Sequence, residues 1–288
     1  MLFVIINVVL GTFNIIASST RYELSGERME NLHTVLEDRG VKISAKLPTN
    51  YKPRPSVNIV YEVSTTATRD SVAKSIFGDD LSQVLRSTRK SEKYKGIEQY
   101  NFKSGDEELS FEKYDVEYNN AAIDKTLEDI NIKKARVYAE KFIKKIGIKN
   151  LYEEVYIEYT KVGDYIKATC YPVVENIAID DVYITMEIYT GGVSKARFTL
   201  AKVERIEGSY TDIMPIDKVL FGINEYVNNM LDVFLDKIVI EEVRLVYKKQ
   251  NLESYNLWGE KNIPMYKLKI SGLEKPIFVN AYINEYIK

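Results

Sequence analysis

The stretch that decides the fold reads VYITMEIYTGGVSKARFTL, residues 182–200. Apolar residues occupy alternate positions on both sides of Gly191-Gly192, as in two strands that each bury one face. A Gly-Gly pair can adopt the positive φ that a two-residue hairpin turn requires. The stretch therefore predicts an antiparallel β-hairpin.

The residues before this hairpin carry similar signals. Apolar residues recur with the helical period over 135–146, and Gly147 is placed to end that helix. Alternating runs at 155–159 and 165–171 face each other across Gly163, which predicts a second hairpin.

Helices and strands also alternate before residue 130. Ser25 is a suitable N-cap for a helix that reaches Arg39. The pattern then predicts a strand from 41 to Pro48, a strand at 57–64, a helix at 68–77, and a meander over 81–118 with strands near 97–103 and 109–118.

The C-terminal part predicts one long helix and three strands. The helix begins at Pro215 and reaches Phe234, and the strands lie at 239–247, 264–271 and 276–283. The sequence thus predicts an α+β fold with two antiparallel-sheet halves and packed helices. The expected boundaries are residues 22–130 for the N-terminal half and 131–288 for the C-terminal half.

The charge is distributed unevenly. The 288 residues include 40 Lys and Arg and 42 Asp and Glu, yet residues 1–20 contain none of them. Twenty helical residues span about 30 Å, which matches the hydrocarbon core of a bilayer. We expect a transmembrane anchor over residues 1–21, with a cleaved signal peptide and a buried core helix as alternatives. The formal net charge of −2 lacks the basic excess typical of nucleic-acid binders.

Polar and small residues gather on one face of this expected helix. They are Asn7, Gly11, Asn14 and Ser18. Small residues let membrane helices approach closely, and Asn can hydrogen-bond across the contact. The face is therefore a candidate partner-binding surface for another transmembrane helix; the alternative is that the polar residues are merely tolerated there.

The residues offer no catalytic constellation. The chain has one His, His33, and one Cys, Cys170, which is too few for a zinc cluster or a Cys–His pair. Cys170 lies in an alternating run and is expected to pack in the core. Acidic pairs occur at 79–80, 180–181 and 241–242, where solvation or a turn is the expected role. We therefore expect no enzyme activity, no cofactor and no metal.

One stretch is locally basic. It contains Arg86, Arg89, Lys90, Lys93 and Lys95. A solvated loop or strand edge is the expected role, and contact with phosphate-bearing polymers or lipid headgroups is the alternative.

The order and spacing of several motifs resemble the YycI family of low-GC Gram-positive bacteria, which is related to YycH. The motifs are the apolar segment with Asn14, Met29–Leu36, Asp38–Ile43, Ala45–Pro48, the helix after Pro215, Ile240–Tyr247, Ile263–Leu268 and Phe278–Tyr282. The resemblance implies a single-pass membrane protein with an extracytoplasmic body. It further implies association with a YycH-like protein, the sensor histidine kinase WalK (YycG) and membrane lipid, and control of cell-wall metabolism, with no enzyme activity.

Two other functions fit parts of the pattern. Halves built from a helix and a meander also occur in PepSY-like exported domains, which inhibit or assist envelope proteases. An envelope hydrolase could use a carboxylate pair held at the required separation.

Replacing Gly11 and Asn14 together with Leu is expected to weaken association with a partner's transmembrane helix. The change removes a close approach and an Asn hydrogen bond that contributes about 1 kcal/mol. Co-purification of the partner from detergent-solubilised membranes measures the effect, with Val9→Leu on the opposite helix face as control. Undiminished recovery with the double variant contradicts the role of this face.

Overall fold

The structure is a computed structural model, and it describes residues 21–125, 130–147, 154–230, 238–250 and 260–287. The predicted anchor over residues 1–21 lies outside the described residues except for Arg21. In the part of the chain that the structure describes, no helix has both the length and the hydropathy of a membrane span.

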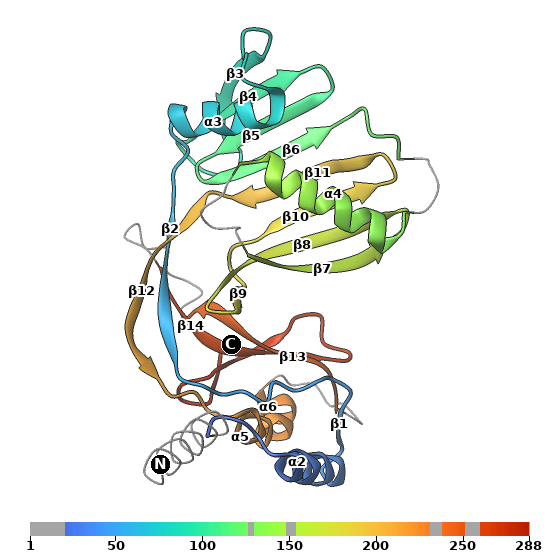
Figure 1. The fold of residues 1–288 in the computed structure, drawn as a ribbon, viewed down its shortest axis with the longest axis vertical. Coiled ribbons are helices and arrows are strands. Elements are labelled where there is room, and N and C mark those ends of the chain that lie inside the picture. The colour runs from blue at the N-terminus through green and yellow to red at the C-terminus, as the bar shows by residue number, and fades with distance from the viewer. Residues whose placement is uncertain (1–20, 126–129, 148–153, 231–237, 251–259, 288) are drawn as a thin grey trace, which may run out of the picture. The chain divides into compact units, whose positions relative to one another are not determined.

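The chain forms two compact units (Figure 1). Unit 1 takes Met1–Ser56, Glu207–Gln250 and Asn262–Lys288, and unit 2 takes Val57–Ile206 and Asn251–Lys261. These units differ from the predicted halves 22–130 and 131–288, since each draws on both sides of residue 130. Three strands, β2 (Arg54–Tyr61), β12 (Ala201–Thr211) and β14 (Glu260–Ile270), contribute residues to both units.

The described residues of unit 1 form three helices and a small mixed sheet. The strand order is β1-β13-β14-β15-β16, parallel between β1 and β13 and antiparallel elsewhere. The elements are α2 (Gly26–Asp38), β1 (Val41–Ile43), α5 (Ile216–Leu220), α6 (Ile223–Met230), β13 (Ile238–Lys249), β14 (Glu260–Ile270), β15 (Ile277–Asn280) and β16 (Glu285–Ile287).

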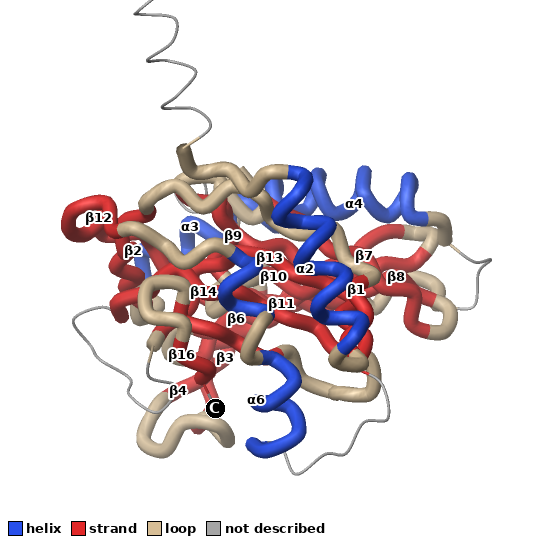
Figure 2. Tube along the Cα trace, turned by 90° about the horizontal axis from the view of Figure 1, so that it is seen from below, coloured by secondary structure: helices blue, strands red, loops and turns tan. Residues whose placement is uncertain are grey.

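The core of unit 1 forms where its helices meet the sheet. Leu36 of α2, Val219 of α5 and Ile240 of β13 belong to one apolar cluster and are fully buried. Figure 2 shows α2 beside β1, as their contacts also record. Ser25 caps α2 by accepting a hydrogen bond from the backbone N–H of Arg28 at 3.3 Å, which confirms the predicted helix start.

Unit 2 contains one antiparallel sheet with strand order β7-β8-β10-β11-β6-β5-β4-β3. A short strand, β9, extends the pairing at the end of β8. The strands are β3 (Leu85–Lys90), β4 (Glu98–Ser104), β5 (Glu107–Glu112), β6 (Asp115–Asn120), β7 (Val155–Val162), β8 (Tyr165–Val174), β9 (Ile177–Ile179), β10 (Ile184–Tyr189) and β11 (Gly192–Thr199).

Two helices, α3 (Thr66–Phe77) and α4 (Ile132–Lys145), cover the same face of this sheet. Arg69 of α3 lies over the Tyr100 ring at 3.7 Å, and Phe142 of α4 contacts the Tyr118 ring with centroids 5.0 Å apart. The strand register places Tyr100 and Tyr118 on one face. The opposite face, which we call the open face, carries no described helix (Figure 1).

The antiparallel, sheet-rich α+β class is confirmed, as are the two predicted hairpins and the helix that Gly147 follows. Gly192 has a φ of +136°, whereas Gly191 keeps a negative φ, so only one glycine of the turn uses its special freedom.

Two predicted elements are each divided in the structure. The strand expected over 109–118 is two strands, β5 and β6, because the chain reverses at Lys113, which has a φ of +59°. The helix expected from Pro215 is interrupted at Phe221–Gly222 into α5 and α6, and its expected end lies outside the described residues.

Cys170 packs in the core of unit 2, as predicted, with 0% of its surface exposed. Burial raises the pKa of its thiol to about 12, so the reactive thiolate is scarce near neutral pH.

A thiol-specific chromogenic reagent is therefore expected not to label the folded chain near neutral pH. It should label one thiol per chain in guanidinium chloride. A Ser87→Cys variant, with its new thiol on an exposed strand, provides the reactive control. Prompt labelling of the unmodified folded chain would show that this core is wrongly described.

Candidate functional site

The open face of unit 2 is a continuous polar surface built by strand alternation. Because buried residues alternate with outward residues along each strand, register aligns the outward ones in rows. One row crosses seven strands and consists of Ser87, Asn101, Ser110, Glu117, Arg197, Thr185 and Thr169.

Glu117 is the central charge of this face. Its carboxylate lies 2.8 Å from Lys195 Nζ and 3.3 Å from Arg197 Nη2. Burial raises the pKa of this carboxyl, but the hydrogen bonds and positive charges of Lys195 and Arg197 outweigh burial, so the net pKa lies below its ordinary value. Glu117 is therefore ionised near neutral pH and holds both cations in place.

A second charged group lies at the end of the face where β6 begins. Asp115 accepts hydrogen bonds from the Tyr94 hydroxyl at 2.8 Å and the Thr199 hydroxyl at 3.2 Å, and it pairs with Lys93. Desolvation lowers the pKa of Lys93, but its hydrogen bond and attraction to Asp115 outweigh this, so the pKa is raised. Lys93 is therefore positively charged near neutral pH.

A relay of side-chain hydrogen bonds fixes the part of the face formed by β3, β4 and β5. Arg89 Nε donates to Gln99 Oε1 at 3.0 Å, and Gln99 Nε2 donates to Asn101 Oδ1 at 2.9 Å. The Ser110 hydroxyl donates to the same Asn101 oxygen at 2.8 Å. These hydrogen bonds hold the four side chains in one arrangement.

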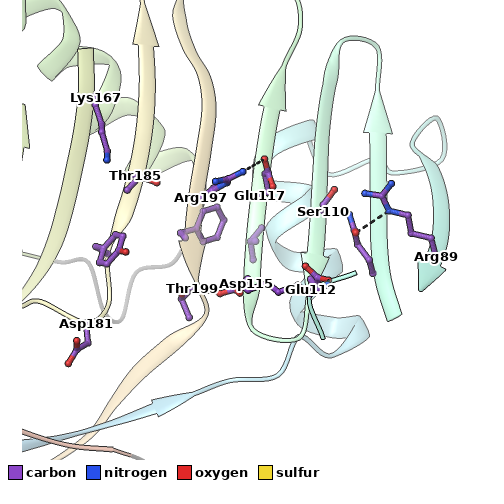
Figure 3. A pocket seen from close by; sticks show the side chains of 15 residues that line it. Arg89, Ser110, Glu112, Asp115, Glu117, Lys167, Asp181, Thr185, Arg197 and Thr199 are labelled. Atoms are coloured by element: carbon purple, nitrogen blue, oxygen red, sulfur yellow. Dashed lines mark hydrogen bonds and ion pairs between the residues drawn. The ribbon is translucent and has the colours of Figure 1, made fainter. Parts of the chain in front are cut away.

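The three groups border one shallow depression of about 690 Å³ (Figure 3). Figure 3 shows Arg197 directed at Glu117, with Thr185 and Lys167 on the neighbouring strands. Its lining carries cations, carboxylates, hydroxyls and amides. Such a surface can recognise a polar protein surface or peptide through many oriented hydrogen bonds.

Tyrosines flank the polar rows on β7, β8 and the residue preceding β10. The Tyr171 ring lies 6.4 Å from Tyr156 and 5.9 Å from Tyr183, centroid to centroid. Tyr156 and Tyr183 are 41% and 45% exposed. Exposed Tyr beside polar groups is typical of the anchor residues of protein interfaces.

The candidate partner residues Asn7, Gly11, Asn14 and Ser18 lie outside the described residues. His33 lies half-buried on α2. No group of three or more metal-binding side chains occurs among the residues that the structure places.

The acidic pairs take local roles. Asp80 accepts a hydrogen bond from the Ser82 backbone N–H at 2.9 Å, which is a turn contact, and this bond lowers its pKa. Glu242 pairs with Arg244, and Glu241 lies 3.5 Å from Lys269. Asp181 borders the depression.

Sequence reasoning missed most of the open face. Of the depression's lining, the predicted basic stretch supplied only Arg89 and Lys93. The available signal was the polar half of each alternating strand, which by itself indicates only solvent exposure.

Comparisons with known proteins show the fold alone. No known family model and no curated protein matches this sequence. An uncharacterised protein from Eubacterium rectale has a similar structure, with a TM-score of 0.60 and 12% identity, over 86% of this chain and 91% of that one.

Two further solved structures are more distantly similar. The C-terminal domain of YpeB from Bacillus megaterium matches with a TM-score of 0.45 and 13% identity, over 79% of this chain and 97% of that one. YycH from Bacillus subtilis matches with a TM-score of 0.43 and 13% identity, over 81% of this chain and 55% of that one.

Replacing Glu117 with Gln is expected to destabilise the protein by about 0.5–1 kcal/mol near neutral pH, because two half-exposed ion pairs are lost. A lowered pKa in the folded state contributes stability above the unfolded pKa, and this stability disappears as pH falls through the folded pKa. The difference from the unmodified protein should therefore vanish in acid.

Urea unfolding of the two proteins, from neutral pH downward, measures this difference. Glu108→Gln on the same face is the control, since Glu108 forms no ion pair within the described part of the chain. A difference that stays constant with pH would contradict the assigned ion pairs.

Proposed function

We propose that this protein is a non-catalytic, membrane-anchored regulator of the YycI type with an extracytoplasmic body. It binds a YycH-like partner and the sensor histidine kinase WalK, and it modulates the two-component signalling that controls cell-wall metabolism. The membrane anchor is the uncharged segment at residues 1–20.

The specific partners rest on the sequence resemblance, whose motifs are spread over almost the whole chain. The fold class of the described body supports this proposal, because its strands are mostly antiparallel and helices pack against them. The protein from Eubacterium rectale has a similar fold, with a TM-score of 0.60.

The observation that carries a binding role is the pre-arranged open face. Its principal charges are already paired with one another, as at Glu117 and Asp115. Side chains that are ordered before binding lose little conformational entropy when a partner covers them. The flanking tyrosines supply apolar contact area beside the polar rows.

Regulation follows if the chain binds two conformations of the kinase with different affinity, since equal affinity shifts no equilibrium. The polar helix face with Asn7, Gly11, Asn14 and Ser18 is proposed as a second contact, inside the membrane. Two contacts on one chain raise the effective concentration of each for the partner.

Placing a bulky side chain in the middle of the open face is expected to disrupt partner binding. Thr185→Trp should reduce recovery of the YycH-like protein or the kinase from detergent-solubilised membranes about tenfold or more, because an indole keeps the surfaces apart. Lys141→Trp, on the exposed side of α4, is the matched control and should leave recovery unchanged.

Two results would contradict the proposal. If the unmodified chain recovers neither the kinase nor a YycH-like protein, the function is wrong. If it recovers them and Thr185→Trp recovers them equally well, the open face is not the binding surface.

A further inference from the structure

The strand β3 ends the sheet of unit 2 and is exposed along its whole length. Its six residues pair with β4 and with no other described strand. Every one of the six is exposed, and Leu85 is 73% exposed. Figure 1 shows β3 at the end of the sheet, with no described helix or strand beyond its outer side.

The backbone of β3 is well suited to accept another strand. Its register with β4 runs without a bulge from Leu85 to Lys90. In an antiparallel pair, alternate residues direct their N–H and C=O groups to the far side. An edge of this length with no bulge and no proline is a template for pairing.

The charge of β3 determines what can pair with it. The sequence LRSTRK contains Arg86, Arg89 and Lys90 and no acidic residue. Arg86 lies 3.2 Å from Asp70 and stacks over Phe102 at 5.1 Å, while Arg89 is held by Gln99. The cationic groups project from both faces of the strand, because side chains alternate between the faces and Arg86 and Arg89 are three positions apart.

Two copies of this edge repel each other, because pairing would bring like charges into opposite positions. An extended segment with acidic residues on both faces would instead gain ion pairs along the strand. We propose that β3 binds an acidic extended segment of a partner protein as an added antiparallel strand. This site is the outer edge of the sheet, where it shares Ser87 and Arg89 with the open face.

A polyanion or a lipid headgroup would bind only the positively charged side chains of β3 and would leave its backbone hydrogen-bonding groups without a partner strand. Lys93, which follows β3 in the sequence, adds little positive charge to this edge because it is already paired with Asp115. The ordered feature at this place is the row of backbone groups, which recognises a peptide.

The test uses the full chain in detergent and a fluorescent acetylated octapeptide, Val-Glu-Glu-Val-Val-Glu-Glu-Val, which carries Glu on both faces when it is extended. A second octapeptide has the same side chains but alternate backbone nitrogens methylated on its pairing side. The first peptide should bind in low salt and more weakly as salt is added. The methylated peptide should bind at least about tenfold more weakly, because it lacks the donors that form the ladder.

Arg89→Glu with Lys90→Glu should weaken binding of the first peptide about tenfold or more, since two attractions become repulsions. Lys95→Glu is the matched control, because it lies in the same basic stretch outside the strand, and it should change affinity less than about twofold. Hydrogen exchange at residues 85–90 should slow when the first peptide binds.

Three outcomes would overturn the proposal. The first is that the acidic peptide does not bind at millimolar concentration, and the second is that the methylated peptide binds equally well. The third is that the protein binds anionic phospholipid vesicles and that the peptide then no longer slows hydrogen exchange at residues 85–90. The two peptides need no variant of the protein, so the result stands even if the double variant fails to fold.

Discussion

The pairing of β6 with β11 is the constraint on which unit 2 depends. These strands lie far apart in the chain, yet their register joins the meander β3–β6 and the strands β7–β11 into one sheet. Ala196 opposes Tyr118, whose ring contacts Phe142 of α4, and both residues are buried. A shift of this register by one residue would turn the apolar side chains of one strand toward the open face. It would also bury Glu117 or Arg197 away from solvent.

The same register gives the open face its order. Arg197 lies opposite Glu117 only because Ala196 and Phe198 occupy the buried positions on either side. Exposed ion pairs contribute about 0–1 kcal/mol each, so burial on the helix side, and not these pairs, accounts for most of the stability. The pairs instead keep the polar surface in one arrangement, which is what binding without large entropy loss requires.

Much of the local structure could be predicted from the sequence, because its determinants are local. The period-two run from Val182 to Ile188 and the glycine at 192 specify the hairpin whatever lies around it. The interruption at Phe221–Gly222 could not be predicted in this way, since it depends on tertiary contacts. Tyr286 donates a hydrogen bond to the Val219 carbonyl at 2.8 Å and stacks on Tyr226, with ring centroids 4.2 Å apart.

The candidate site was less predictable for a related reason. The sequence pattern of a strand does not distinguish a polar residue that faces solvent from one that faces a partner. Only the register between strands that are distant in the sequence shows that Ser110, Glu117 and Arg197 form a row. Compact units also follow long-range pairing, which is why they cross residue 130.

The central claim is that the open face contacts the extracytoplasmic part of a membrane-bound partner protein. A photo-crosslinking amino acid at position 185 of the full chain, irradiated in native membranes, tests it most directly. The account predicts a covalent adduct with the kinase or a YycH-like protein from position 185 and none from position 141 on α4. Adducts from position 141 alone, or none from position 185, would contradict it.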